Sequence, residues 1–277
     1  MKHFLTLSLV LLFNLGIYSQ DEIVLIAHNN YLVGAAQNGK WLKDTDVPNE
    51  FGKPLKFIGF DSFKSGEKPS AIYGTLGQLG CNANLFYFSE SPKVPESIFD
   101  ETSLKPILAI SSNAKWNPLP RYAKKISLTN KTYRKIALDF LKTKKINTKS
   151  VKLENIFSVD LEGDGTDEIF LEATNYKDKN GEIGGTARAG NYSFVLMRKM
   201  INGKPKNFLI EGEFHPKKPI QEDYISEFEL SAFADLNGDG KMEVILYGLY
   251  SYGGVSTEIY ELDKNRLKEV LGVECGD

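Results

Sequence analysis

The fold of this chain is decided by residues 156–171, which read IFSVDLEGDGTDEIFL. An oxygen-rich turn lies in the middle of this stretch, and apolar, strand-like residues flank the turn on both sides. The same pattern returns at residues 232–246, which read AFADLNGDGKMEVIL. A pattern that recurs within one chain indicates an internal repeat, so we expect two related β-units in the second half of the protein.

Both turns carry oxygen-bearing side chains at relative positions 1, 3, 5 and 9, with glycine at position 6. Alternating side chains of such a turn face one centre, and a backbone carbonyl at position 7 adds a further oxygen. Calcium takes about six to eight oxygen ligands in irregular geometry, so the sequence predicts two Ca²⁺ sites. The predicted ligands are Asp160, Glu162, Asp164, Thr166 and Glu168 in the first loop (residues 160–168), and Asp235, Asn237, Asp239, Lys241 and Glu243 in the second loop (residues 235–243).

Other interpretations of the acidic loops are less favoured. An EF-hand loop ends in a bidentate Glu and lies between helices, whereas here Leu171 and Leu246 occupy the corresponding position and strand-like runs flank the loops. Magnesium keeps its bound waters and seldom uses an all-protein cage. An acidic turn that binds no ion is the remaining alternative.

The second loop resembles the calcium loops of FG-GAP/VCBS-type repeats, which occur in integrin-like β-propellers. Its residues match the D-x-[DN]-x-D-G-x-x-[DE] pattern of that family position by position. The first loop matches at Asp160, Asp164, Gly165 and Glu168. The resemblance covers roughly residues 152–262, and it implies a calcium-stabilised extracellular β-structure but no reaction.

Glu162 departs from the family pattern, which favours Asp or Asn at this position. Its longer side chain would either crowd the site or bind calcium through water. If Glu162 fits, we expect the first loop to bind calcium more tightly, because it offers four carboxylates against three in the second loop.

The remaining sequence predicts a mainly β protein with one or two helices. Asn38-Gly39 and Asn202-Gly203 lie between strand-like runs and predict hairpin turns. Around residues 131–145 the apolar side chains recur at helical spacing, which predicts the one clear helix. We expect an N-terminal β-rich region at 21–120, a basic helical linker at 121–150 and a calcium-loop β-repeat region at 151–277.

The β-repeat region is predicted to form a β-propeller-like or sandwich-like array of calcium-loop β-units. A propeller needs at least about four blades, and only two loops are present. The N-terminal region would therefore have to supply unmarked blades, or the array is smaller than a propeller.

The N-terminus predicts export. Residues 1–20 have a short basic start, an apolar run from 4 to 17 and small or polar residues after it, which is the layout of a signal peptide. The run is shorter than the about 20 residues of a membrane span, so we expect a periplasmic or extracellular protein with no membrane span after cleavage. The two cysteines, Cys81 and Cys275, form a possible disulfide, and two free thiols are the alternative.

No catalytic or cofactor-binding constellation is predicted. HExxH and GxSxG motifs are absent, and His28 and His215 are interpreted as surface or turn residues. The favoured function is a non-catalytic calcium-binding module for recognition or envelope structure, with an extracellular protein or glycan as partner. The alternative is a secreted hydrolase or carbohydrate-binding protein, in which Trp41 or Trp116 stacks on sugars. The net charge of −2 indicates no charged partner, and export argues against nucleic acid as a partner.

Overall fold

A computed structural model describes residues 22–47, 53–64, 69–78, 84–92, 108–177, 181, 183, 186–219 and 224–276. Over these residues the protein is mainly β and has one α-helix, which confirms the predicted fold class at that level. The predicted signal peptide and Cys81 lie outside the described residues. In the part of the chain that is described, no helix has the length and apolar character that crossing a membrane requires.

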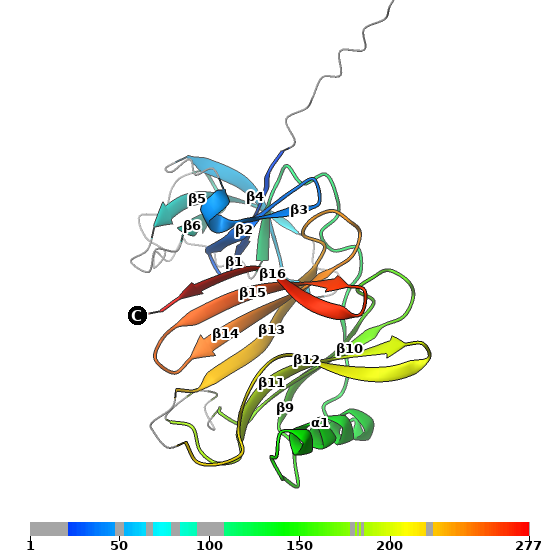
Figure 1. Cartoon of the computed structure of the whole chain (residues 1–277). Helices are drawn as coiled ribbons and strands as arrows, with labels where there is room; N and C mark the ends of the chain where they lie inside the picture. The colour runs from blue at the N-terminus through cyan, green and yellow to red at the C-terminus, as the bar shows by residue number, and fades with distance from the viewer. Residues whose placement is uncertain are drawn as a thin grey trace, which may run out of the picture.

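The N-terminal strands close into a barrel. Their order is β1-β7-β4-β5-β6-β2, and the pairing of β1 with β2 completes the ring of six strands. The barrel lies at the top of Figure 1 and packs its own aromatic core, in which the ring of Phe57 meets those of Phe86 and Phe88 edge-on at 4.7 and 5.2 Å. The strands are β1 (Val24–His28), β2 (Tyr31–Gln37), β4 (Pro54–Phe60), β5 (Ser70–Gln78), β6 (Asn84–Ser89) and β7 (Leu108–Ser111), with β3 (Lys40–Lys43) beside β2 and the short 3-10 helix η1 (Asp44–Asp46) after it.

The predicted hairpins are present. Asn38 and Gly39 turn β2 into β3 with φ of 53° and 68°, and Asn202 and Gly203 turn β11 into β12 with φ of 52° and 72°. Asparagine and glycine tolerate this left-handed conformation better than other residues, which is why the pattern was readable in the sequence. Because the described N-terminal strands close on themselves, they do not supply propeller blades.

The second half of the chain forms two antiparallel sheets of similar plan. In each sheet four consecutive strands pair in chain order, and an acidic loop joins the first strand to the second. The first sheet unit contains β9 (Leu153–Val159), β10 (Glu168–Thr174), β11 (Asn191–Ile201) and β12 (Lys204–His215), with β8 (Lys124–Lys125) beside β9. The second sheet unit contains β13 (Ser226–Ala234), β14 (Glu243–Tyr250), β15 (Val255–Asp263) and β16 (Arg266–Cys275).

The molecule is a stack of layers, visible from bottom to top in Figure 1 as helix, first sheet unit, second sheet unit and barrel. Helix α1 (Lys131–Thr143) is capped by Asn130, whose side chain accepts the N–H groups of Thr132 and Tyr133. Its buried residues, Ala137 and Leu141, pack on the first sheet unit. Separate apolar clusters fill the space between the two sheet units and between the second unit and the barrel. The second unit is therefore buried on both faces.

His28 and His215 are both buried, so their interpretation as surface or turn residues was wrong. His28 ends β1 at the contact between barrel and second sheet unit, where its ring nitrogens lie 2.7 Å from Thr257 Oγ1 and 2.5 Å from Ser231 Oγ. Burial lowers the pKa of His28 to about 3. The turn after β1 folds inward against the second unit, which the sequence around Asn29 did not indicate.

We expect His28 to make folding stability depend on pH. Its pKa is about 3 in the folded protein and 6.5 in the unfolded chain, so between these values only the unfolded chain takes up the proton, and stability falls as pH falls. At pH 5 the loss is about 2 kcal/mol relative to pH 7.5. Urea unfolding of the wild type and of His28→Asn at pH 7.5 and pH 5 measures this loss. The difference in free energy of unfolding between the two proteins should be smaller at pH 5 by that amount, because only the wild type has this histidine. If this difference does not change with pH, His28 is not buried in its neutral form.

Candidate metal centre at the paired acidic loops

The second loop joins β13 to β14, and Asp235 organises its backbone. Asp235 Oδ1 accepts the N–H of Gly238 at 2.7 Å, and Oδ2 accepts the N–H of Gly240 at 3.0 Å. Both glycines have positive φ, 80° and 83°, so other residues would strain the turn. Asn237 Oδ1 and Asp239 Oδ1 each accept a backbone N–H from two residues further on, at 2.9 and 2.8 Å.

Glu243 at position 9 is the most unusual group of the second loop. Its side chain is buried, with the residue 1% exposed, and Oε2 accepts the N–H of Leu236 at 2.7 Å. Oε1 has no hydrogen-bond partner among the described residues. Burial raises the pKa of Glu243 well above its usual range. The hydrogen bond from the N–H of Leu236 lowers this pKa, whereas the neighbouring carboxylates of Asp235 and Asp239 raise it further. A buried oxygen without a partner is costly and calls for an explanation.

Other buried carboxylates with unpartnered oxygens lie outside the acidic loops. Glu227 has such atoms but lies 2.8 Å from the ammonium of Lys177, which balances its charge. Glu258, in β15, also has one, and burial raises its pKa to about 7. Glu243 differs from both because it closes a turn that already contains Asp235 and Asp239.

The first loop repeats the same backbone bonds. Asp160 accepts the N–H of Gly163 at 2.7 Å and that of Gly165 at 2.9 Å, and these glycines have φ of 72° and 83°. Asp164 Oδ1 accepts the N–H of Thr166 at 2.8 Å. Glu168 Oε2 accepts the N–H of Leu161 at 3.1 Å, as Glu243 does with Leu236.

Lys199 makes the first loop different. Its ammonium donates to Glu168 Oε1 at 2.7 Å and also to Glu162. Burial alone would lower the pKa of Lys199, but the hydrogen bonds with Glu162 and Glu168 raise it above its ordinary value, so the ammonium stays charged. Glu162, which departs from the family pattern, is therefore held by a lysine from β11.

The linker between barrel and first sheet unit fixes both loops. Arg121 donates from Nε to the carbonyl of Asp160 at 2.5 Å, and from one terminal nitrogen to the carbonyls of Leu161 and Gly240 at 2.8 and 2.9 Å. The loops also touch directly, because the N–H of Met242 donates to Leu161 at 2.9 Å. One guanidinium thus binds the backbones of both loops.

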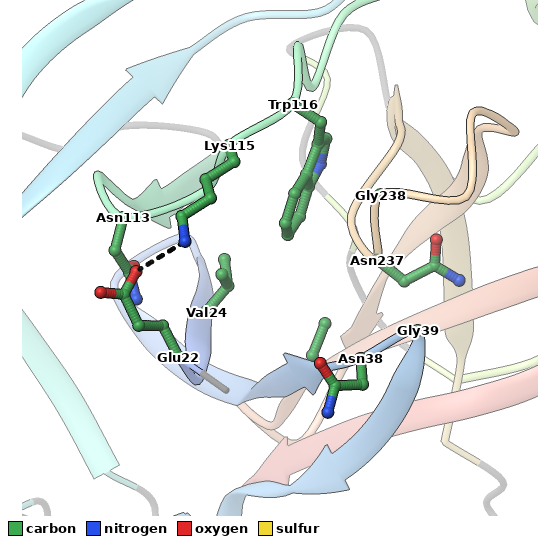
Figure 2. Close-up of a pocket in the computed structure, with 10 residues that line it drawn as sticks. Glu22, Val24, Asn38, Gly39, Asn113, Lys115, Trp116, Asn237 and Gly238 are labelled. Carbon is green, nitrogen blue, oxygen red and sulfur yellow. Dashed lines mark ion pairs between the residues drawn. The ribbon is translucent and has the colours of Figure 1, made fainter. Parts of the chain in front are cut away.

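Trp116 holds the second loop from the barrel side. Its indole N–H donates to the carbonyl of Asp235 at 2.8 Å. A Cβ on Gly238 would lie 2.9 Å from the Trp116 ring, so the ring packs on the glycine backbone. Figure 2 shows Trp116 beside Asn237 and Gly238, with the Asn237 amide directed away from the ring.

A cavity of about 300 Å³ opens next to the second loop. Trp116, Asn237 and Gly238 line one side, and residues from β1 and the turn at Asn38 line the other. Lys115 and Glu22 form an ion pair at 4.0 Å beside Asn113, marked by the dashed line in Figure 2. The cavity therefore combines an aromatic ring with polar and charged groups.

The predicted ligand side chains are not gathered around a metal-binding point. Over the described ranges, no group of at least three His, Cys, Asp or Glu side chains is arranged to hold an ion. The reason lies in the bonds above: both oxygens of Asp160 and of Asp235 accept glycine N–H groups, and the position-5 acids accept the N–H groups of Thr166 and Lys241.

A hard cation fits the two loops unequally. The side-chain donors predicted for the second loop at positions 1, 3, 5 and 9 are all oxygens, the ligand type that calcium prefers, and one of them, Oε1 of Glu243, has no partner among the described residues. In the first loop, the corresponding Oε1 of Glu168 is already bound by an ammonium. Sequence reasoning missed Lys199, Arg121 and the packing of Trp116, because all three reach the loops from other segments.

The predicted disulfide stays a prediction. Cys275 is in a disulfide, and Cys81 lies outside the described residues.

Comparison with known proteins identifies no relative: no protein-family model, no curated protein and no solved structure matches this chain. The resemblance to FG-GAP/VCBS-type repeats therefore stays a hypothesis drawn from the loops.

We expect Arg121→Ala to destabilise the protein by about 2 kcal/mol, because three carbonyls of the two loops lose a charged donor. Urea unfolding measures the change. Arg198→Ala is the matched control, since Arg198 donates to Asn207 on an exposed strand pair, and we expect at most about 0.5 kcal/mol there. Equal losses in the two variants would mean that Arg121 does not join the loops in solution.

Proposed function

We propose that this chain is an exported calcium-binding protein, a non-catalytic module for recognition or envelope structure, and that the second loop is its calcium site. The supporting observation is the buried, unpartnered Oε1 of Glu243, which closes a turn rich in oxygen ligands. A divalent cation would give this oxygen a partner and would offset the repulsion between Glu243 and the nearby acids. Asp235, Asn237, Asp239 and Glu243 would supply the side-chain ligands, and Lys241 its backbone carbonyl.

Calcium at the second loop would act on the junction of the whole molecule. This loop contacts Trp116 of the linker directly, and Arg121 connects it to the first loop. An ion at tenfold excess over its dissociation constant would stabilise the fold by about 1.4 kcal/mol. A weak site with a dissociation constant of about 10⁻⁴ to 10⁻³ M suffices outside the cell, which agrees with the apolar N-terminal segment and its proposed export.

We further propose that the two sheet units form a small blade-like array of the FG-GAP/VCBS type. The supporting observations are their matching strand order, the position of each acidic loop between first and second strand, and the apolar cluster packed between the sheets. A propeller has at least about four blades, so two such units do not form one. The barrel covers the outer face of the second unit instead.

A carbohydrate-binding function is the second candidate, because the cavity beside the second loop exposes Trp116 among amide and charged groups. Trp41 and Trp116 are the two tryptophans of the chain, so a Trp41→Phe variant reports on Trp116 alone. A change in its fluorescence on adding oligosaccharides, lost in Trp116→Leu, would support this function. Unchanged fluorescence across a panel of glycans would count against it.

We expect millimolar calcium to raise the midpoint of thermal unfolding by several degrees relative to a chelator, because a gain of 1 kcal/mol shifts the midpoint of a chain this long by about 2–4 °C. Glu243→Gln should abolish the rise, since the amide removes the charge while keeping the shape. Magnesium at equal concentration should do less. Identical midpoints with calcium and with chelator would reject calcium binding as the function of these loops.

A further inference from the structure

The two loops share most of their backbone hydrogen bonds, but they differ at the position-9 glutamate. Oε2 of the position-9 glutamate accepts the same backbone N–H in each loop, at 3.1 Å in the first and 2.7 Å in the second. Oε1 is bound by the Lys199 ammonium at 2.7 Å in the first loop, and it has no partner among the described residues in the second. Both loops join the first strand to the second in sheet units of the same strand order.

The strand register explains the difference. Ile169 pairs with Arg198, so one residue further along the ladder Glu168 lies opposite Lys199. Val244 pairs with Tyr260 in the second sheet unit, so the residue opposite Glu243 is Glu261. The position that carries a positive charge in the first unit therefore carries a negative charge in the second.

Glu261 adds to the unbalanced charge at the second loop. Its carboxylate accepts the indole N–H of Trp41 at 2.8 Å and raises the pKa of Glu243 as a minor contributor after burial. Glu168 and Glu243 are both about 1% exposed. A buried carboxylate stays ionised only with a counter-charge. The first loop has one in Lys199, and the second has none among the described residues.

An ammonium and a calcium ion exclude each other from one site, because both are cations that need the same oxygens. Lys199 is itself buried and binds Glu162 and Glu168 together. Lys199 lies in β11 and pairs with Lys206 of β12, so a hydrogen-bonded sheet positions its ammonium.

We propose that Lys199 takes the place of a calcium ion in the first loop, so that the protein binds a single calcium ion, at the second loop. The proposal rests on the proposed calcium-binding function, and it replaces the expectation of two sites. It also makes the first loop independent of calcium, while the second depends on it.

Calcium stoichiometry separates the two proposals. Calorimetric titration of the chelator-treated full-length protein with calcium chloride should give one ion per chain, lost in Glu243→Gln and kept in Glu168→Gln. Two ions per chain would overturn the role of Lys199 and leave calcium binding intact. No bound ion would overturn both. One ion that is lost in Glu168→Gln would place calcium in the first loop and overturn the role of Lys199.

Lys199→Met tests the lysine directly, because methionine keeps an unbranched apolar stem without the charge. We expect this variant to bind two calcium ions per chain. Lys177→Met is the matched control, since Lys177 is also held by two carboxylates, Glu227 and Glu229, away from the acidic loops. It should bind one ion. A Lys199→Met protein that still binds one ion, or a control that also gains one, would overturn the proposal.

The reverse substitution keeps the test open if Lys199→Met fails to fold. Glu261→Lys places a lysine opposite Glu243 as Lys199 lies opposite Glu168. We expect this variant to bind no calcium and to have the same unfolding midpoint with calcium and with chelator. A Glu261→Lys protein that binds one ion with wild-type affinity would contradict the proposed exchange of lysine for metal.

Discussion

A carboxylate buried at the start of a central strand needs a positive partner, and this requirement shapes the second half of the molecule. Glu168 and Glu243 begin β10 and β14, and each lies almost entirely out of solvent. Their oxygens hold the preceding loop closed through a backbone N–H. Because burying such a charge alone costs several kcal/mol, a cation within reach would stabilise the ionised carboxylate of each loop. The first loop has Lys199, and calcium is the proposed cation of the second.

The position of the loops gives that cation its structural effect. Both loops lie where the linker leaves the barrel and enters the sheets, and Arg121 joins their backbones. The second sheet unit is packed on both faces, by the barrel and by the first unit, so its loop lies at the centre of the stacked layers. Trp116 connects the same loop to the cavity beside the barrel. An ion bound there would set the geometry of the cavity as well as the stability of the junction.

The local features of the fold were readable in the sequence, and the long-range ones were not. The helix capped at Asn130 and the Asn-Gly hairpins follow from periodicity and from residues that adopt positive φ. Closure of the barrel depends on pairing β1 with both β2 and β7, which no local pattern encodes. Lys199 was missed because β10 ends at Thr174 and β11 begins only at Asn191, so the register opposite Glu168 could not be counted along the chain.

The most direct test of the account is a crystal structure grown with calcium, in which the anomalous signal locates the ion. The account predicts one ion, at the second loop, bound by Glu243 and by oxygens of Asp235, Asn237 and Asp239, with the Lys199 ammonium still between Glu162 and Glu168. An ion in the first loop with Lys199 displaced, or no ion at the second loop at millimolar calcium, would contradict it.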